Sequence, residues 1–155
     1  MAEVYKVSFY SEEIEVTVTK DSSVVKSWIL QTLQTHRRRL RKLIVGIDIE
    51  WLPCFNPEES HPVALLQLCV GPCCLLFQLL HKDAVPGFLV DFLGNPNFKF
   101  VGVGVTEDAK KLLCDHRLFV ANTEPIGVIW EDGIEENGER GTLESNGEAI
   151  ECNIE

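Results

Sequence analysis

Two carboxylates interrupt an otherwise apolar stretch, residues 43–51, and are the first side chains that could do chemistry. The stretch reads LIVGIDIEW, and its alternation predicts a strand whose first face carries Leu43, Val45, Ile47, Ile49 and Trp51. Asp48 and Glu50 fall on the second face with Gly46, where the missing side chain leaves room for a ligand. Carboxylates with Cα atoms ~6.5–7 Å apart suit a hard cation such as Mg²⁺. The alternative is a strand with one solvated face.

A third carboxylate, Asp108, lies near the start of a predicted helix after residue 105. Thr106 is expected to cap this helix, and Asp108 flanks its apolar stripe of Val105, Ala109, Leu112, Leu113 and His116. Glu107 and Lys111 are expected to point away and to pair with each other. Asp108 is explained either by the favourable position of an acid at a helix N-terminus or by a site shared with Asp48 and Glu50.

The other elements must position these acids. Alternation predicts an N-terminal hairpin over residues 4–10 and 14–19, whose inner faces are Tyr5, Val7 and Phe9, and Ile14, Val16 and Val18. A helix follows, from about residue 22 to 36. Residues 44–51, 63–70 and 73–80 are predicted as consecutive antiparallel strands, the last two covered on both faces. A short helix over 86–93 leads to a fourth strand over 98–105.

Charge divides the chain into two parts. Residues 1–123 hold 14 acids and 13 bases, whereas residues 124–155 hold 10 acids and a single base, Arg140. The sequence therefore predicts one folded domain over residues 1–123 and an acidic, largely disordered tail over 124–155. Within the domain, residues 36–42 form the basic run HRRRLRK. The run could contact substrate phosphates, complement the end of the preceding helix, or serve as a localisation signal.

The cysteines and the N-terminus indicate the cellular compartment of the protein. None of the six cysteines has paired CxxC spacing, and Cys69, Cys73 and Cys74 lie in apolar strand patterns, so we expect buried small side chains rather than metal ligands. The N-terminus has no apolar signal core, and no run is long enough to cross a membrane. We therefore expect an intracellular protein of the nucleus or cytoplasm.

Several motifs together resemble one enzyme family. The DxEW of Asp48–Trp51, the strands VALLQLC and CCLLFQL, and VGVGVTEDAKKL around Asp108 resemble the DnaQ-like 3′–5′ exonucleases of the DEDD group. The nearest resemblance is to small plant proteins similar to the exonuclease domain of the Werner syndrome helicase. It runs from about residue 4 to 123.

The resemblance implies an α/β fold of the ribonuclease H-like type, a mixed sheet with flanking helices, here truncated at its C-terminus. It implies a two-metal phosphodiesterase in which Asp48, Glu50 and Asp108 are catalytic and bind Mg²⁺ or Mn²⁺. The family's third motif, a Tyr or His followed by an Asp, is missing. The two tyrosines, Tyr5 and Tyr10, precede the first motif, and Asp132, the last Asp, has no such partner.

The sequence is compatible with two functions that belong to different classes. The first is a 3′–5′ exonuclease acting on single-stranded or recessed 3′ ends, weak or inactive because a lost general base alone typically costs ~10²–10⁴-fold in rate. The second is a non-catalytic module that binds nucleic acid or oligomerises through sheet surface left bare by the missing helices.

Overall fold

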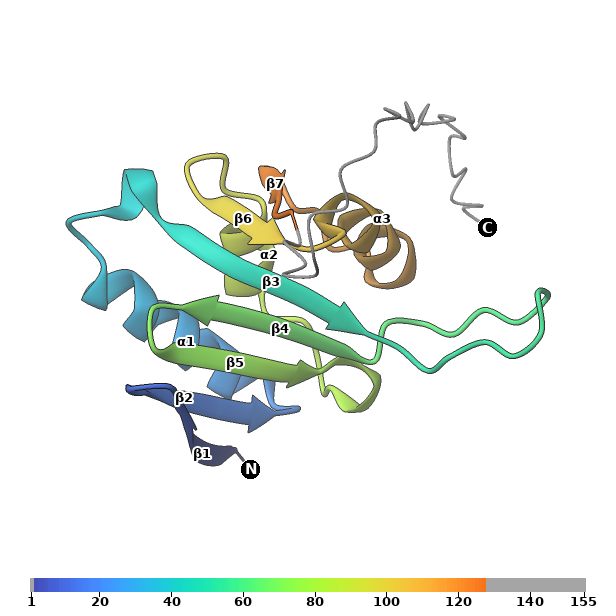
Figure 1. The fold of residues 1–155 in the computed structure, drawn as a ribbon, viewed down its shortest axis with the longest axis horizontal. Helices are drawn as coiled ribbons and strands as arrows, with labels where there is room; N and C mark the ends of the chain where they lie inside the picture. Colours follow the sequence, from blue (N-terminus) through green and yellow to red (C-terminus); the bar gives the residue numbers. More distant parts are fainter. Residues whose placement is uncertain (1, 128–155) are drawn as a thin grey trace, which may run out of the picture.

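The computed structural model describes residues 2–127, in which seven strands and three α-helices form one mixed sheet with flanking helices (Figure 1). The strands are β1 (Glu3–Phe9), β2 (Glu12–Thr19), β3 (Ile44–Glu50), β4 (Leu65–Val70), β5 (Cys73–Gln78), β6 (Lys99–Gly102) and β7 (Thr123–Pro125). The helices are α1 (Ser22–Thr35), α2 (Gly87–Leu93) and α3 (Val105–His116), and two 3₁₀ turns are η1 (Leu40–Lys42) and η2 (Leu79–His81).

The strands lie in the order β1-β2-β5-β4-β3-β6-β7, so the strand that carries Asp48 and Glu50 is an interior one. β3, β4 and β5 are antiparallel neighbours, as their short connections predicted. The pairs β2–β5, β3–β6 and β6–β7 are parallel. The predicted N-terminal hairpin is confirmed as the antiparallel pair β1–β2.

One face of the sheet is the core. It carries the alternate apolar residues of the central strands: Val45, Ile47 and Ile49 of β3, Leu66 and Leu68 of β4, and Leu75 and Phe77 of β5. In Figure 1, α1 and α2 lie behind the strands, and they cover this face with buried residues such as Val25, Ile29, Leu89 and Phe92. This packing fixes β3 with Asp48 and Glu50 on its opposite face.

The opposite face is only partly covered, and here two predictions are wrong. Tyr5, Val7 and Phe9, expected to face inward, are 50%, 47% and 60% exposed. In β2 the buried residues are Thr17 and Thr19, while Ile14, Val16 and Val18 are half-buried. Leu65 and Leu76 are also half-buried, so β4 and β5 are not covered on both faces. Within residues 2–127 no helix packs on this side of β1, β2 and β5, which is the physical reason for the exposure.

Two glycines shape the passage from β6 into α3. A Cβ on Gly102 would contact the carbonyl oxygen of Ile47, because β6 and β3 approach closely there. Gly104 adopts a left-handed conformation with φ 65° and is the N-cap of α3, so the helix begins before Thr106, and the predicted Thr106 cap is wrong. The backbone N–H of Asp108 donates to the carbonyl of Gly104 at 3.1 Å, which places Asp108 in the first turn.

The cysteine prediction needs a correction. Cys69 of β4 and Cys74 of β5 form a disulfide, because the antiparallel register places them opposite each other with Cα atoms 4.1 Å apart. Both were expected to be unpaired small hydrophobic residues. Cys73, the neighbour on the other face of β5, is free and half-buried, as expected.

The strand β7 includes Glu124 and Pro125, two residues that the sequence assigned to the acidic tail. The disorder predicted for the tail falls on residues that, from 128 onward, lie outside the described part of the chain. The division into a domain and a tail stays a prediction. Among the described residues, no helix has the length and hydropathy needed to cross a bilayer.

Candidate active site on strand β3 and helix α3

Asp48 and Glu50 lie on the uncovered side of β3, near its C-terminal end. Their side chains are exposed, whereas Ile47 and Ile49 between and beside them are at most 5% exposed in the core. The Oδ1 atom of Asp48 accepts a hydrogen bond from the backbone N–H of Ile49 at 3.0 Å. The alternation of β3 therefore aims both carboxylates into the same space, as the sequence predicted. Trp51 differs, because it lies beyond the end of β3 and is 41% exposed.

Asp108 reaches this space from the first turn of α3. Its side chain is half-buried, and α3 packs against β3, β6 and β7 through Val105 and Leu112. The parallel pairing of β3 with β6 is what sets the start of α3 beside the C-terminal end of β3. The three acids thus come from two elements that are separated by more than 50 residues in the sequence.

The electrostatics of Asp108 show that the three carboxylates share one side of the sheet. Partial burial, followed by the negative charges of Asp48 and Glu50 and then Glu107, raises the pKa of Asp108 to about 6. Like charges raise a carboxyl pKa only when they lie close to it, so the first and second motifs meet in space. Without a cation, the carboxyl group of Asp108 therefore stays largely protonated up to a pH of about 6.

The wall beside the acids is the connection between β3 and β4, and α3 holds it in place. Lys111 forms an ion pair with Asp115 at 3.0 Å, donates to the carbonyl oxygen of His61 at 2.8 Å and lies over the ring of Trp51. Asp115 also accepts the N–H of Val63 at 2.9 Å. The ring Nε2 of His116 lies 2.7 Å from the carbonyl oxygen of Val63. These contacts fix both ends of residues 51–63.

This arrangement corrects one sequence prediction and adds residues that the sequence did not single out. Glu107 pairs with Lys110 at 3.1 Å rather than with Lys111, whose side chain turns toward the wall and is only 22% exposed. The spacing of Lys111 and Asp115, four residues apart on a helix, was the available signal. A cavity of about 350 Å³ lies between wall and helix and is lined by residues that include Trp51, Ser60, Asp108, Lys111 and Asp115.

The site lacks two features of a complete metal centre. In the part of the chain that the structure describes, no three His, Cys, Asp or Glu side chains are already close enough together to hold an ion. Tyr5 and Tyr10 lie on or beside β1, which is four strands from β3, or about 19 Å across the sheet. Neither tyrosine can replace the missing third motif.

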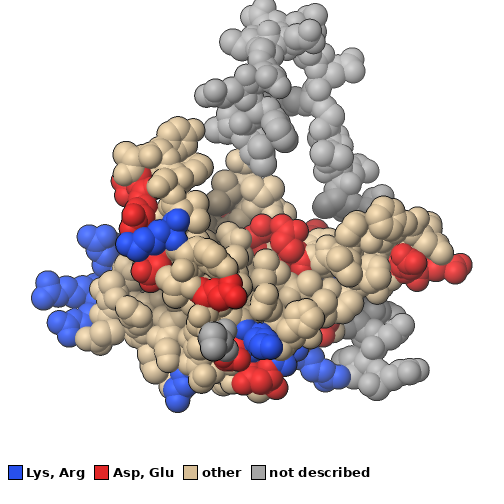
Figure 2. All heavy atoms as spheres, turned by 90° about the horizontal axis from the view of Figure 1, so that it is seen from below, with Lys and Arg blue, Asp and Glu red and all other residues tan. Residues whose placement is uncertain are grey.

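The basic run of residues 36–42 is not next to the acids. It precedes β3, whereas Asp48 and Glu50 lie toward the end of that strand. Lys42 ends η1 and Asp48 lies within β3, and their separation of six residues corresponds to at most about 20 Å. Figure 2 shows several Lys and Arg side chains gathered at one end of the molecule and others along its lower edge, while Asp and Glu side chains are spread across this face.

Comparisons with known proteins give a consistent result. No protein-family model matches the chain. The chain is 40% identical over 73 residues to the Mus musculus bifunctional 3′–5′ exonuclease/ATP-dependent helicase WRN, a match that covers 46% of this chain and 5% of that protein. It is 36% identical over 97 residues to the Drosophila melanogaster exonuclease 3′–5′ domain-containing protein 2, covering 62% of this chain and 16% of that protein.

A crystal structure of the EXD2 exonuclease domain soaked in Mg and GMP superposes with a TM-score of 0.61 and 26% sequence identity. The superposition covers 71% of this chain and 55% of that chain, so this chain spans about half of the solved domain. The fold has the predicted mixed sheet. This chain is therefore similar in sequence to 3′–5′ exonucleases, and its fold is that of the EXD2 exonuclease domain, which is ribonuclease H-like.

Proposed function

We propose that this chain acts as a metal-dependent 3′–5′ exonuclease domain, with Asp48, Glu50 and Asp108 as its catalytic carboxylates. The observation that carries the proposal is the raised pKa of Asp108, caused by burial and by the charges of Asp48 and Glu50. Acids that a fold forces together against repulsion are typical of functional sites, and a cation relieves the repulsion. The exonuclease names of the relatives support the same function.

The donor set fits Mg²⁺ or Mn²⁺, because hard cations prefer carboxylate oxygens. Asp48, Glu50 and Asp108 would hold the metal after their side chains converge, since they do not form a ready-made set of three ligands. Bound divalent cations supply an activated water and stabilise the leaving oxygen of the phosphodiester. The EXD2 exonuclease domain was soaked in Mg and in Mn for its structures, which supports the choice of these ions.

The chain's own residues orient the substrate end. Asp48 and Glu50 are fixed on a strand whose other face is buried, so their direction does not depend on a mobile loop. Trp51 lies at the edge of the adjoining cavity and offers an aromatic surface for the terminal base of a single-stranded or recessed 3′ end. Lys111 neutralises Asp115 and holds the wall, so the cavity keeps its shape.

The proposed activity is slow, because no residue replaces the Tyr or His of the third motif among the described residues. Loss of a general base typically lowers the rate by ~10²–10⁴-fold. The remaining acids still position the metal and the phosphate. We therefore expect cleavage that is detectable at enzyme concentrations near that of the substrate.

The proposal is tested with a 5′-labelled single strand and a recessed duplex, incubated with the full chain and Mg²⁺ or Mn²⁺. A ladder of strands shortened from the 3′ end, lost with chelator and in Asp48→Asn, is the expected result. Asp91→Asn removes one exposed acid from α2 and is the matched control. Shortening that persists in Asp48→Asn, or no shortening with either metal, would contradict the proposal.

A second candidate function is a non-catalytic module that binds nucleic acid or a second copy of the chain. The exposure of Tyr5, Phe9 and Ile44, each at least 50%, favours it, because apolar sheet surface of this kind promotes association. Sedimentation of the purified chain over a range of concentrations separates the two. A stable dimer with no cleavage would favour the module over the enzyme.

A further inference from the structure

A polyanion bound at the acids must be held by cations elsewhere, and six of the eight Lys and Arg residues outside the run 36–42 in residues 2–127 are already engaged. Four lysines of residues 2–127 form ion pairs with acids: Lys6 with Glu13, Lys99 with Glu124, Lys110 with Glu107, and Lys111 with Asp115. Lys82 bonds the carbonyl of Leu79, and Lys26 lies over the ring of Phe88. Nucleic-acid affinity comes chiefly from cations that neutralise phosphates, so these residues cannot supply it without losing their partners.

Five other cations form one cluster, which we call the basic turn: Arg37, Arg38, Arg39, Arg41 and Lys42. All five side chains are exposed, and no ion pair of the described residues includes any of them. Elsewhere in residues 2–127 acids outnumber bases, so the basic turn is the strongest concentration of positive charge in this part of the chain. The positive charges of such a cluster attract a polyanion, and they repel one another when no polyanion is bound.

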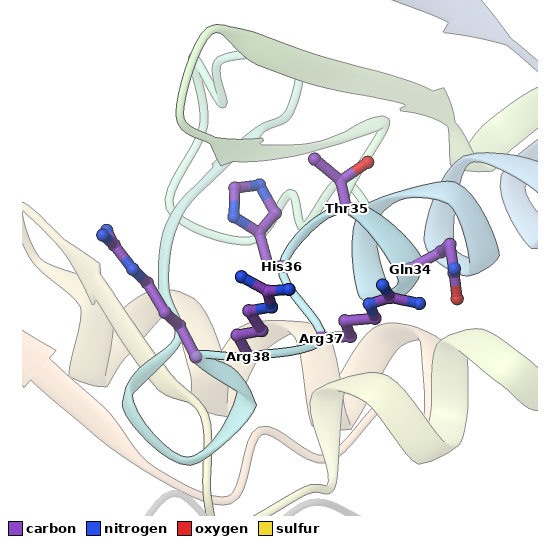
Figure 3. A pocket seen from close by; sticks show the side chains of 6 residues that line it. Gln34, Thr35, His36, Arg37 and Arg38 are labelled. Atoms are coloured by element: carbon purple, nitrogen blue, oxygen red, sulfur yellow. The ribbon is translucent and has the colours of Figure 1, made fainter.

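The basic turn is an ordered structure. The N–H of Arg39 donates to the carbonyl of His36 at 2.8 Å, and that of Lys42 donates to Arg39 at 2.8 Å. Leu40, the apolar residue within it, packs against the hydrophobic core and anchors the turn. Two adjoining open hollows share Arg37, Arg38 and Arg39 as walls, and Figure 3 shows Arg37, Arg38 and His36 around the first of them. Guanidinium groups on a fixed backbone suit phosphate oxygens, which they bind through paired hydrogen bonds.

We propose that the basic turn binds the sugar–phosphate backbone of the nucleic acid upstream of the 3′ end that occupies the acid site. This inference rests on the proposed function for the position of the 3′ end. The separation of at most about 20 Å from Lys42 to Asp48 corresponds to at most about six base pairs at 3.4 Å per nucleotide. At this stacked rise a substrate of two or three nucleotides is too short to reach the turn from the acids, whereas one of about 20 nucleotides is long enough.

The test measures binding, so it does not depend on cleavage. Fluorescence anisotropy with chelator present follows a labelled trinucleotide and a labelled strand of about 20 nucleotides, titrated with the full chain at several salt concentrations. In Arg37→Gln/Arg38→Gln/Arg39→Gln we expect binding of the long strand to weaken about tenfold or more, and the slope of log K against log salt to decrease by about 2. Binding of the trinucleotide should not change.

Two control variants make the test specific. Lys6→Gln/Lys20→Gln/Lys26→Gln removes the same charge from β1, the end of β2 and α1, and should leave binding of the long strand within about twofold. Arg37→Lys/Arg38→Lys/Arg39→Lys keeps the charge and should keep most of the salt slope. Circular dichroism of each variant confirms that the fold is retained.

Long-strand binding that is equal in the Gln variant and in the unchanged chain would overturn the proposal, as would a loss of the same size in the lysine control. Unchanged strand binding with loss of nuclear accumulation in cells would assign the basic turn to a transport protein instead. If the long strand binds through the basic turn but is never shortened, the proposed exonuclease function fails, and of this inference only the contact between the turn and the sugar–phosphate backbone holds.

Discussion

Replacing Asp108 by Asn should make the protein more stable at pH 8 and leave its stability at pH 4 unchanged. The pKa of Asp108 is raised from its ordinary 3.8 to about 6 in the folded chain, first by burial and then by the charges of Asp48 and Glu50. The folded state therefore binds the proton more tightly than the unfolded state does. Stability falls as the pH rises from about 4 to about 6, and the full cost remains at higher pH.

The size of the effect follows from the same values. A difference from 3.8 to about 6 corresponds to an upper limit of about 3 kcal/mol. Asp108 is only half-buried, so solvent screening reduces the cost to about 1 kcal/mol. For a domain of this size, removal of the charge should raise the melting temperature by about 3–4 °C at pH 8.

The assay is thermal unfolding followed by circular dichroism at pH 4 and pH 8, with and without Mg²⁺. The unchanged chain should gain stability from Mg²⁺ at pH 8, because a cation replaces the proton, and Asp108→Asn should gain much less. Asp91→Asn, on the exposed side of α2, is the control and should change neither comparison. A variant at Asp108 that is less stable than the unchanged chain at pH 8 would refute the assignment of repulsion among the three acids.

Three further predictions concern the frame of the site. Gly102→Ala places a Cβ against the carbonyl of Ile47 and should lower the unfolding free energy by about 1–3 kcal/mol in denaturant titration, whereas Gly87→Ala, with open space around it, should change it little. Lys111→Met removes the ion pair to Asp115 and the bond to His61, so limited proteolysis within residues 51–63 should accelerate; an unchanged cleavage rate would mean that Lys111 does not hold the wall. The backbone N–H groups of Ser22 and then Ala84 lower the pKa of Asp83, so Asp83→Asn should destabilise the start of α1 at pH 7, and the difference in melting temperature should shrink as the pH falls from 3.8 through the lowered pKa; a difference that does not shrink would argue against this.

The sequence predicted the two faces of β3 well because a strand period of two separates faces without knowledge of the partners. Ile47 and Ile49 are buried and Asp48 and Glu50 are not, and the antiparallel order of β3, β4 and β5 followed from short connections. The start of α3 was less predictable. Gly104 in a left-handed conformation, not the hydroxyl of Thr106, begins the helix, and that depends on how β6 ends.

Properties that depend on which elements cover a surface could not be read from alternation. Tyr5, Val7 and Phe9 have the pattern of an inner face but are exposed, because no helix among residues 2–127 packs on them. The Cys69–Cys74 disulfide depends on the register of β4 against β5, which sequence spacing alone does not specify. The wall formed by Lys111 and Asp115 depends on the path of residues 51–63, where no regular pattern exists.

Isothermal titration of the full chain with Mn²⁺ tests the central claim, that Asp48, Glu50 and Asp108 share a divalent cation. The account predicts saturable binding that weakens about tenfold or more in each of Asp48→Asn, Glu50→Gln and Asp108→Asn and is unchanged in Asp91→Asn. Mn²⁺ binding that Asp108→Asn leaves intact, or no binding to the unchanged chain, would contradict it.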